Sequence, residues 1–281
     1  MSRAVEETGT PAAPAPGPAG LVARDVSVTY TRKRTGEQVR AVQGLDVAVA
    51  PREFLSIVGP SGCGKSTFLK VVAGLAEPNA GCITLAGRPL AEAADRRAMV
   101  FQDASLFPWY SVLRNLTYGL ECRGTPAKEA RSAVRPLIGK VGLTGFEKHY
   151  PYELSGGMQQ RVNLARALAV DPEILLMDEP FAALDAQTRE IMQAELLRIW
   201  TETRKTVVFV THQIDEAIYL SDRVVVMSAR PGRIILDVRV ALPRPRGLDI
   251  KETPEFQALH RQIWGLLEQE VRASMRLRDR A

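Results

Sequence analysis

The residues best suited to chemistry form a glycine-rich loop, GPSGCGKST, over residues 59–67. Apolar runs flank this loop at 54–58 and 68–73, as expected of a strand–loop–helix unit. The G-x-x-x-x-G-K-S spacing is that of a phosphate-binding loop, whose glycines let successive N–H groups close around phosphate oxygens. Lys65 adds positive charge at the helix start, and the Ser66 hydroxyl can bind Mg²⁺.

The loop therefore predicts a site for ATP or GTP. A glycine-rich turn with a chance lysine is the alternative, but all four fixed positions of the pattern are present. The expected nucleotide-binding residues of the loop are Gly59, Pro60, Ser61, Gly62, Cys63, Gly64, Lys65, Ser66 and Thr67.

Two neighbouring carboxylates, Asp178 and Glu179, follow the apolar run 174–177. Ligands of α/β sheets bind at the carboxyl ends of the strands, which is where these side chains are expected to lie. Asp178 is suited to hold Mg²⁺ directly or through water, and Glu179 to polarise a water molecule aimed at a γ-phosphate. Two acids at an ordinary strand end are the alternative interpretation.

The periodicity of apolar residues predicts the elements that position these groups. Alternation over 22–30 and 45–49 predicts antiparallel strands before the loop. Continuous apolar runs at 174–177 and 207–210 predict parallel strands buried on both faces, joined by a crossover helix over 187–203. Further strands are expected at 83–85 and, buried, at 99–101, and helices at 112–121, 127–141 and 157–170.

The expected fold class is α/β, with a P-loop NTPase core and a mixed parallel sheet, an antiparallel β subdomain and an inserted α-helical subdomain. Residues 1–20, rich in Ala, Pro and Gly, predict a disordered tail. The nucleotide-binding domain is expected over 21–240, with the helical insertion at about 104–170. Residues 241–281 predict a linker, an amphipathic helix packed on its own domain, and a basic tail.

The bulk composition excludes several classes of protein. The 281 residues carry a net charge of +5, without the clustered basic stripe of a nucleic-acid-binding protein. Cys63, Cys82 and Cys122 are odd in number and lack metal-ligand spacing, which favours a reducing, cytoplasmic setting. No apolar segment approaches the roughly 18 residues that cross a bilayer. We expect a chain that neither spans a membrane nor is secreted.

A third motif, LSGGMQQR over 154–161, begins a predicted helix. Locally, Ser155 can cap the helix, and Gly156 and Gly157 let a phosphate approach exposed N–H groups. Together with the two earlier motifs, this segment makes residues 21–235 closely resemble the ATP-binding-cassette (ABC) nucleotide-binding domain. The motifs that carry the resemblance are 59–67 (Walker A), 154–160 (signature) and 174–179 (Walker B).

The resemblance implies roles for further residues. Tyr30 matches the aromatic residue that stacks on adenine, and Gln102 the glutamine that senses Mg²⁺ and the attacking water. His212 matches the switch histidine that contacts the γ-phosphate, and Asp185 lies in a segment similar to the D-loop of the dimer interface. Taken alone, Tyr30 would be assigned to core packing and Gln102 to a solvated loop. Asp185 can cap the next helix and still lie at the dimer interface. For His212, which follows a buried strand at the carboxylate edge, the γ-phosphate contact is favoured over a core histidine.

The resemblance also implies partners. Two copies, identical or closely related, would meet head to tail, so that the Ser155 segment of one caps the nucleotide held by Lys65 of the other. Hydrolysis of the γ-phosphate would then open the dimer. The apolar segment Leu106, Phe107, Pro108, Trp109 and Tyr110 matches the place where importer cassettes receive their membrane subunit; packing inside the helical insertion is the alternative.

The segments 107–109, 179–189 and 211–217 are most similar to the nitrate, sulfonate and taurine importer branch. We therefore expect an ATPase subunit, peripheral on the cytoplasmic face of the plasma membrane, that works with a separate permease and an external solute-binding protein. A soluble mechanochemical ABC ATPase would carry tandem cassettes or a coiled-coil insertion, and the sequence has neither. Glu179 and the Ser155 segment argue against a P-loop kinase or a binding module without turnover.

Overall fold

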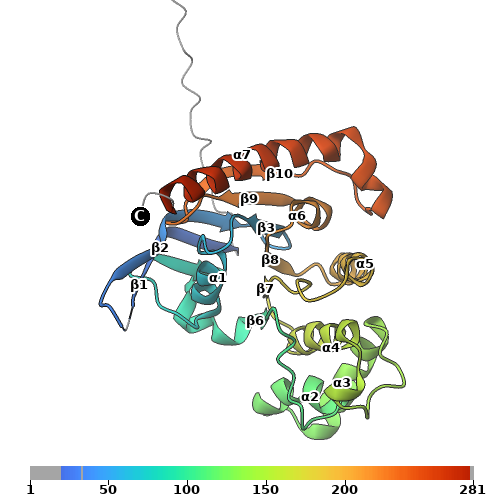
Figure 1. Ribbon diagram of the computed structural model, residues 1–281. Coiled ribbons are helices and arrows are strands. Elements are labelled where there is room, and N and C mark those ends of the chain that lie inside the picture. The colour runs from blue at the N-terminus through green and yellow to red at the C-terminus, as the bar shows by residue number, and fades with distance from the viewer. Residues whose placement is uncertain (1–19, 33, 279–281) are drawn as a thin grey trace, which may run out of the picture.

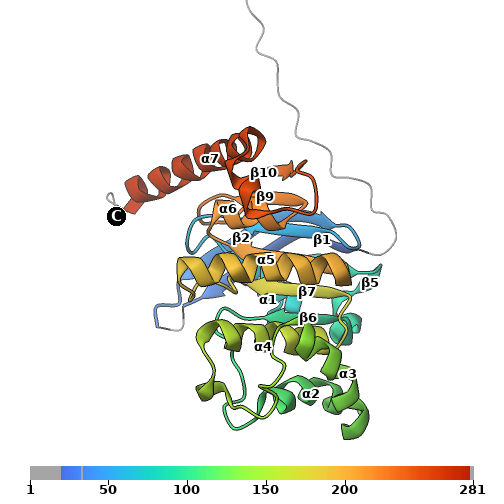
Figure 2. The same cartoon turned by 90° about the vertical axis from the view of Figure 1, so that its right-hand side faces the viewer.

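The computed structural model describes residues 20–32 and 34–278 and contains two sheets with helices on both sides of the larger one (Figures 1 and 2). Nearly all of the predicted tail over 1–20 and the last residues of the basic end lie outside the described ranges. Within those ranges, no helix combines the length and apolar composition needed to cross a bilayer.

The larger sheet has six strands in the order β10-β9-β3-β8-β7-β6. Its central strands pair in parallel, and β10 is antiparallel to β9. The mixed, mainly parallel sheet predicted from the sequence is therefore confirmed. The strands are β3 (Phe54–Val58), β6 (Arg97–Val100), β7 (Ile174–Asp178), β8 (Thr206–Thr211), β9 (Arg223–Met227) and β10 (Ile234–Arg239).

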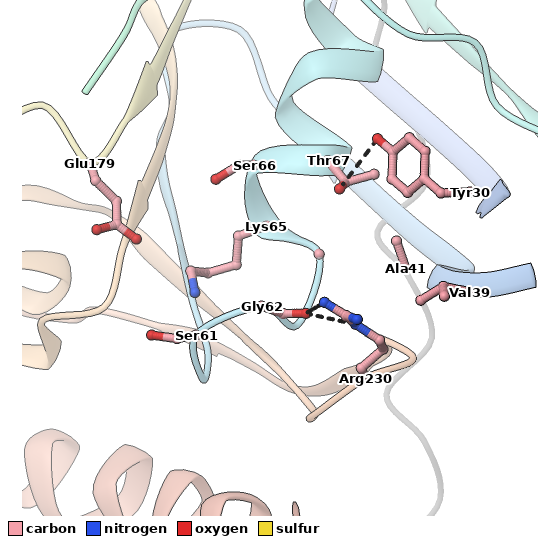
Figure 3. A pocket seen from close by; sticks show the side chains of 11 residues that line it. Tyr30, Val39, Ala41, Ser61, Gly62, Lys65, Ser66, Thr67, Glu179 and Arg230 are labelled. Carbon is pink, nitrogen blue, oxygen red and sulfur yellow. Dashed lines mark hydrogen bonds between the residues drawn. The ribbon is translucent and has the colours of Figure 1, made fainter. Parts of the chain in front are cut away.

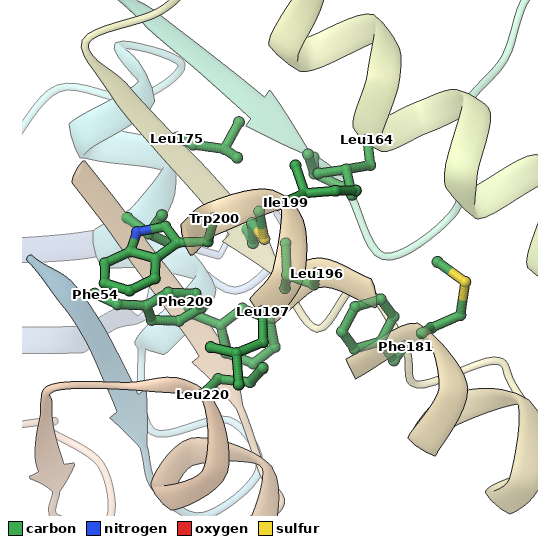
Figure 4. Packing of buried hydrophobic residues seen from close by; sticks show 14 of the residues in the cluster. Phe54, Leu164, Leu175, Phe181, Leu196, Leu197, Ile199, Trp200, Phe209 and Leu220 are labelled. Carbon is green, nitrogen blue, oxygen red and sulfur yellow. The ribbon is translucent and has the colours of Figure 1, made fainter. Parts of the chain in front are cut away.

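Every residue of β3, β7, β8 and β9 is buried, because both faces of these strands are covered. Alternate side chains of one strand enter different cores. Phe54 of β3 packs toward the helices α5 (Ala186–Thr203) and α6 (Ile214–Leu220), with its ring centroid 5.7 Å from that of Trp200 (Figure 4). Leu55 enters a second core with α1 (Lys65–Ala73) and the smaller sheet.

The expectation that the strand at 99–101 is buried is wrong. The strand is β6, at the edge of the sheet, and most of its residues are half-buried. An edge strand has a neighbour on one side only, so its side chains are less covered than those of β7 and β8. Gln102 follows this edge strand and is exposed.

The smaller sheet is antiparallel, in the order β2-β1-β4-β5, and confirms the predicted antiparallel subdomain. Its strands β1 and β2 pair over nearly their whole length, from Leu21 opposite Val49 to Thr31 opposite Gln38. This sheet and α1 cover the face of the larger sheet opposite to α5 and α6 (Figure 1). The strands are β1 (Leu21–Thr31), β2 (Gln38–Val49), β4 (Ala80–Leu85) and β5 (Arg88–Pro89).

Helices α2, α3 and α4 gather beyond the β6 edge, and α7 lies at the opposite, β10 end of the sheet in both views (Figures 1 and 2). The three helices lie within one or two residues of the predicted segments and confirm the helical insertion in the fold class. The remaining elements are α2 (Val112–Cys122), α3 (Ala127–Lys140), α4 (Gly156–Ala169), α7 (Pro254–Arg278) and the 3₁₀ helices η1 (Leu90–Arg96), η2 (Pro151–Glu153) and η3 (Leu248–Glu252).

The C-terminal segment is fixed to the domain at two points. Phe256, Ile263 and Leu267 of α7 are buried, so one apolar face of this helix packs on its own domain, as its periodicity predicts. Before α7, the stretch 243–247, interpreted from sequence as a linker, contains Arg246, which is only 5% exposed. Its guanidinium donates to the backbone oxygens of Ile218, Tyr219, Ser221, Val240 and Leu242.

Desolvation by burial lowers the pKa of Arg246 to about 10, which leaves the side chain charged at neutral pH. The guanidinium is hydrogen-bonded to carbonyl oxygens at the end of α6, and the nearby Asp222 carboxylate also favours its charged form. This arrangement ties residues 243–247 to α6.

We predict that Arg246→Ala lowers the free energy of unfolding by roughly 3 kcal/mol, because several buried carbonyl groups lose their donor. Urea denaturation followed by circular dichroism measures the change. Arg239→Ala, which removes an exposed arginine from the end of β10, is the matched control and should cost less than about 0.5 kcal/mol. Equal losses for the two variants would contradict a structural role for the buried guanidinium.

Candidate functional site

The phosphate-binding loop joins β3 to α1, as the sequence predicts. It turns through Gly62 (φ +75°) and Gly64 (φ +111°), conformations that residues with a side chain rarely adopt. A Cβ atom on Gly64 would lie 2.6 Å from the backbone oxygen of Ala41 on β2. Glycine at this position is therefore required both by the backbone conformation and by the contact with the neighbouring sheet.

Lys65 begins α1 and lies inside the curve of the loop (Figure 3). Its side chain is 5% exposed, and Nζ donates to the backbone oxygens of Gly59 and Pro60 at 2.8 and 3.0 Å. The sulfur of Cys63 lies 3.9 Å from the same Nζ. Burial raises the pKa of the Cys63 thiol, which favours its neutral form and a packing role within the loop.

A cavity of about 260 Å³ opens over the loop and the start of α1. Tyr30 of β1 is 45% exposed at this cavity, and its hydroxyl donates to Thr67 Oγ1 at 3.5 Å. Because the ring is exposed, it is available to a ligand rather than enclosed in the core. The lining residues are Tyr30, Val39, Ala41, Ser61, Gly62, Gly64, Lys65, Ser66, Thr67, Glu179 and Arg230.

Ser66 brings the end of β7 into the site, since its hydroxyl donates to Asp178 Oδ1 at 2.7 Å. Burial raises the pKa of the Asp178 carboxyl, and the hydrogen bond from Ser66 partly offsets this effect. A hydroxyl and a carboxylate oxygen are ligands that Mg²⁺ accepts, and Mg²⁺ commonly uses one or two carboxylates together with substrate phosphates. The pair Ser66 and Asp178 therefore fits a magnesium ion bound beside the phosphate loop.

Glu179 follows β7 with a left-handed backbone conformation, φ +45°, which is unusual for a residue with a side chain. Its backbone N–H is bonded to Val210 O at 2.9 Å, so the conformation is fixed by β8. The carboxylate oxygen Oε2 accepts a hydrogen bond from His212 Nδ1 at 2.7 Å. Strain of this kind is concentrated at functional sites, and here it places a carboxylate in the wall of the cavity.

Gln102 and the Ser155 segment are not brought to this cavity. Gln102, Gly156 and Leu184 line a second cavity of about 430 Å³, between the helical subdomain and the loop after β7. The Ser155 hydroxyl accepts from Met158 N at 3.3 Å, as a helix cap does. Asp185 likewise caps α5, and hydrogen bonds from Thr188 lower the pKa of its carboxyl.

The comparison with known proteins decides the family. Residues 42–182 match the family model for the ABC transporter. An uncharacterized ABC transporter ATP-binding protein of Methanocaldococcus jannaschii is 52% identical over 241 residues, which cover 86% of this chain and 89% of the relative. The chain belongs to the ABC transporter family.

Two further similarities place this ABC ATPase among its relatives. The taurine import ATP-binding protein TauB of Jannaschia sp. is 42% identical over 260 residues, covering 90% of this chain and 96% of the relative. A solved dimeric ATP-binding cassette, in a post-hydrolysis state bound to ADP and Pi, superimposes with a TM-score of 0.69 at 31% identity. That alignment covers 81% of this chain and all of the solved chain.

Sequence reasoning missed Arg230, which lies in the turn between β9 and β10 of this ABC ATPase and lines the first cavity. Its guanidinium donates to the backbone oxygen of Gly62 at 3.0 and 3.1 Å. In the sequence, Arg230 is only part of a turn-like segment with Pro231 and Gly232, 168 residues after Gly62. No local pattern could have predicted this contact.

The predicted partner segment of the ABC ATPase is partly packed and partly exposed. Phe107 packs edge-on against Tyr118 of α2, with ring centroids 4.8 Å apart, and Asn115 holds the segment through bonds to the backbone N–H and oxygen of Phe107. Trp109 remains 67% exposed. The packing interpretation therefore holds for Phe107, whereas Trp109 leaves an exposed indole on this packed base.

We predict that Gly64→Ala weakens ADP binding by about tenfold or more, because the added methyl group must displace the loop from Ala41. Isothermal titration calorimetry measures the affinity. Gly87→Ala is the matched control, since Gly87 also has a positive φ, +74°, but a Cβ atom added there would have no neighbour within 4 Å. That variant should bind ADP like the parent chain and lose only about 1 kcal/mol of stability. Comparable loss of affinity in both variants would contradict the steric explanation.

Proposed function

We propose that this chain is the ATP-hydrolysing subunit of an importer that energises uptake of a small sulfonate, such as taurine, through a separate permease. The observation that carries the proposal is the meeting, at the Lys65 loop, of two pairs of side chains: Ser66 with Asp178, and Glu179 with His212. The printed name of the TauB relative supports the solute class.

The first pair serves the metal. Ser66 and Asp178 would hold Mg²⁺, which when bound neutralises charge on the phosphate oxygens. Lys65 supplies a second positive charge, and the N–H groups of the loop orient the phosphates. Because phosphoryl transfer to water requires little covalent chemistry from the protein, these residues would act by positioning the phosphates and by electrostatic stabilisation.

The second pair serves the water. Glu179 would accept a proton from a water molecule as that water attacks the γ-phosphate. His212 donates to Glu179, which orients the carboxylate and lets the histidine respond to the same phosphate. Gln102 lines the second cavity, away from Ser66. Its proposed role at Mg²⁺ and the attacking water therefore requires the segment after β6 to move toward Ser66.

The chain is proposed to work as a dimer. The similar cassette of known structure is dimeric, which supports this proposal. The segment Ser155, Gly156 and Gly157 begins α4 away from the Lys65 cavity of its own chain, so its N–H groups are available to the nucleotide of a second copy. Loss of the γ-phosphate would remove the charge that holds two such surfaces together, and the dimer would open.

The permease is proposed to dock at the segment of Leu106, Phe107, Trp109 and Tyr110. Trp109 offers a large exposed ring on a base fixed by Phe107 and Asn115, a combination that suits a docked helix. On this proposal the chain is peripheral, on the cytoplasmic face of the plasma membrane, and an external solute-binding protein delivers the solute to the permease.

We predict that Glu179→Gln retains ATP binding but lowers turnover by roughly 100-fold or more, because the general base is lost. The variant should also accumulate as a dimer with ATP, measured by light scattering. Glu173→Gln is the control, since Glu173 precedes the opposite end of β7 and pairs with Arg96 at the surface. Parental turnover by Glu179→Gln in the presence of the permease would refute the assignment.

We predict that Trp109→Ala lowers permease-stimulated ATP turnover by about tenfold and leaves the turnover of the isolated subunit unchanged. The same variant should fail to restore taurine uptake in a strain lacking the native subunit. Leu75→Ala removes a comparably exposed apolar residue, 61% exposed, after α1 and should behave like the parent. Normal uptake with Trp109→Ala would exclude this docking surface, whereas absence of taurine uptake with the parent chain would exclude the solute.

A further inference from the structure

The turn between β9 and β10 is built into the nucleotide site. Gly232 of this turn donates its N–H to Ala41 O at 3.0 Å, and its own oxygen accepts from Gln43 N at 3.0 Å. A Cβ atom on Gly232 would lie 2.2 Å from the backbone oxygen of Cys63. The turn is thus in direct backbone contact with both β2 and the phosphate loop, and its position relative to the cavity is fixed.

This turn presents the Arg230 guanidinium to the cavity. Nε and Nη2 share one acceptor, the oxygen of Gly62, and the other N–H groups have no partner among the described residues. No ion pair in that part of the chain includes Arg230. An arginine with unsatisfied donors at a cavity wall is suited to bind an anion, and phosphate above all.

The place of Arg230 in the cavity indicates which phosphate it can reach. In Figure 3, Arg230 lies on the same side of Lys65 as Tyr30 and Ala41, while Glu179 lies on the other side. If the adenine is at Tyr30 and the γ-phosphate faces Glu179, the Arg230 side corresponds to the phosphate nearest the ribose.

A second residue holds the turn from outside. Glu270 of α7 accepts a hydrogen bond from Ala229 N at 2.8 Å through Oε2. Ala229 directly precedes Arg230, so this bond restrains the backbone that carries the guanidinium. Because α7 is anchored by the buried side chains of Phe256 and Ile263, Glu270 is a fixed support rather than a loose surface acid.

We propose that Arg230 is a nucleotide-contacting residue that binds the α-phosphate, and that Glu270 is a positioning residue that holds the Arg230 turn from the C-terminal helix. The inference rests on the proposed function in one respect, that a nucleoside polyphosphate binds at the Lys65 loop. It adds a second cation to the site and makes α7 a support for nucleotide binding.

The test measures the dissociation constants of ADP and ATP by calorimetry, in EDTA so that no hydrolysis occurs. Arg230→Ala should weaken both nucleotides equally, by about tenfold, a value at the low end for a charge-assisted contact because the guanidinium is exposed. Arg233→Ala is the matched control, because Arg233 lies in the same turn but its guanidinium is bonded to Gln43 Oε1. Its affinity should equal that of the parent.

Three results would overturn the assignment of Arg230. Unchanged affinity in Arg230→Ala would exclude the contact. A loss of affinity for ATP alone would place the guanidinium at the γ-phosphate. An equal loss of affinity in Arg233→Ala would show that the effect comes from the net charge of the turn and not from a specific contact of Arg230. The parent chain keeps the two proposals separate. If the parent does not bind nucleotide, the proposed function is refuted. If it binds nucleotide with an affinity that Arg230→Ala does not change, only this inference is refuted.

Glu270 is tested by a double-mutant cycle on the same affinities. Glu270→Ala should weaken ADP roughly threefold, and Glu270→Gln, which keeps a carbonyl acceptor for Ala229 N–H, should restore the parental value. In the Arg230→Ala background, Glu270→Ala should have no further effect, because Glu270 acts through Arg230. Additive losses, or failure of the Gln variant to restore binding, would show that Glu270 acts on the fold in general.

Discussion

The close approach of three backbone segments at the phosphate loop is the constraint on which the rest of the structure depends. Gly64 lies against Ala41 of the antiparallel sheet, and Gly232 of the β9–β10 turn lies against Cys63 within the loop. Neither contact leaves room for a side chain. As a result, the two sheets and the loop meet with little freedom. The cations of Lys65 and Arg230 are held by hydrogen bonds to backbone oxygens of the loop.

The acidic half of the site is organised differently. Asp178 is buried and Glu179 lies at the cavity wall, yet the two are consecutive in the chain. The left-handed conformation at Glu179 turns its carboxylate toward His212, while Asp178 remains with Ser66. The left-handed φ angle at Glu179 therefore separates the Asp178 carboxylate, which is suited to bind a metal ion, from the Glu179 carboxylate, which is suited to accept a proton.

Much of the architecture could be predicted because local patterns determine it. The apolar runs of β7 and β8 and the helix between them follow from composition and length, and the loop is recognised from the spacing of its glycines around Lys65. The elements that were predicted poorly depend on distant partners. Most of β6 is only half-buried because of its place at the sheet edge, and Gln102 directly beyond this strand is exposed.

The arginines show the same limit. Arg230 and Arg246 both occur in Pro- and Arg-containing stretches that are typical of turns or linkers, yet one contacts the phosphate loop and the other is buried beneath α6. Their contacts are made with backbone oxygens that are far away in sequence or presented by another element. Such a backbone acceptor cannot be recognised from the amino-acid sequence, because every residue has a carbonyl group.

The alternation of strand side chains between two apolar cores has a consequence for the precision of the site. Because both cores accept aliphatic residues, hydropathy alone does not distinguish the observed alignment of β7 with β8 from one displaced by a single position. Such a displacement would bury similar side chains but turn the Asp178 carboxylate to the opposite face, away from the Ser66 hydroxyl. The alignment must then be determined by the polar strand ends and by the shapes of individual core residues. The accuracy with which Asp178 faces Ser66 therefore depends on the packing of the apolar cores.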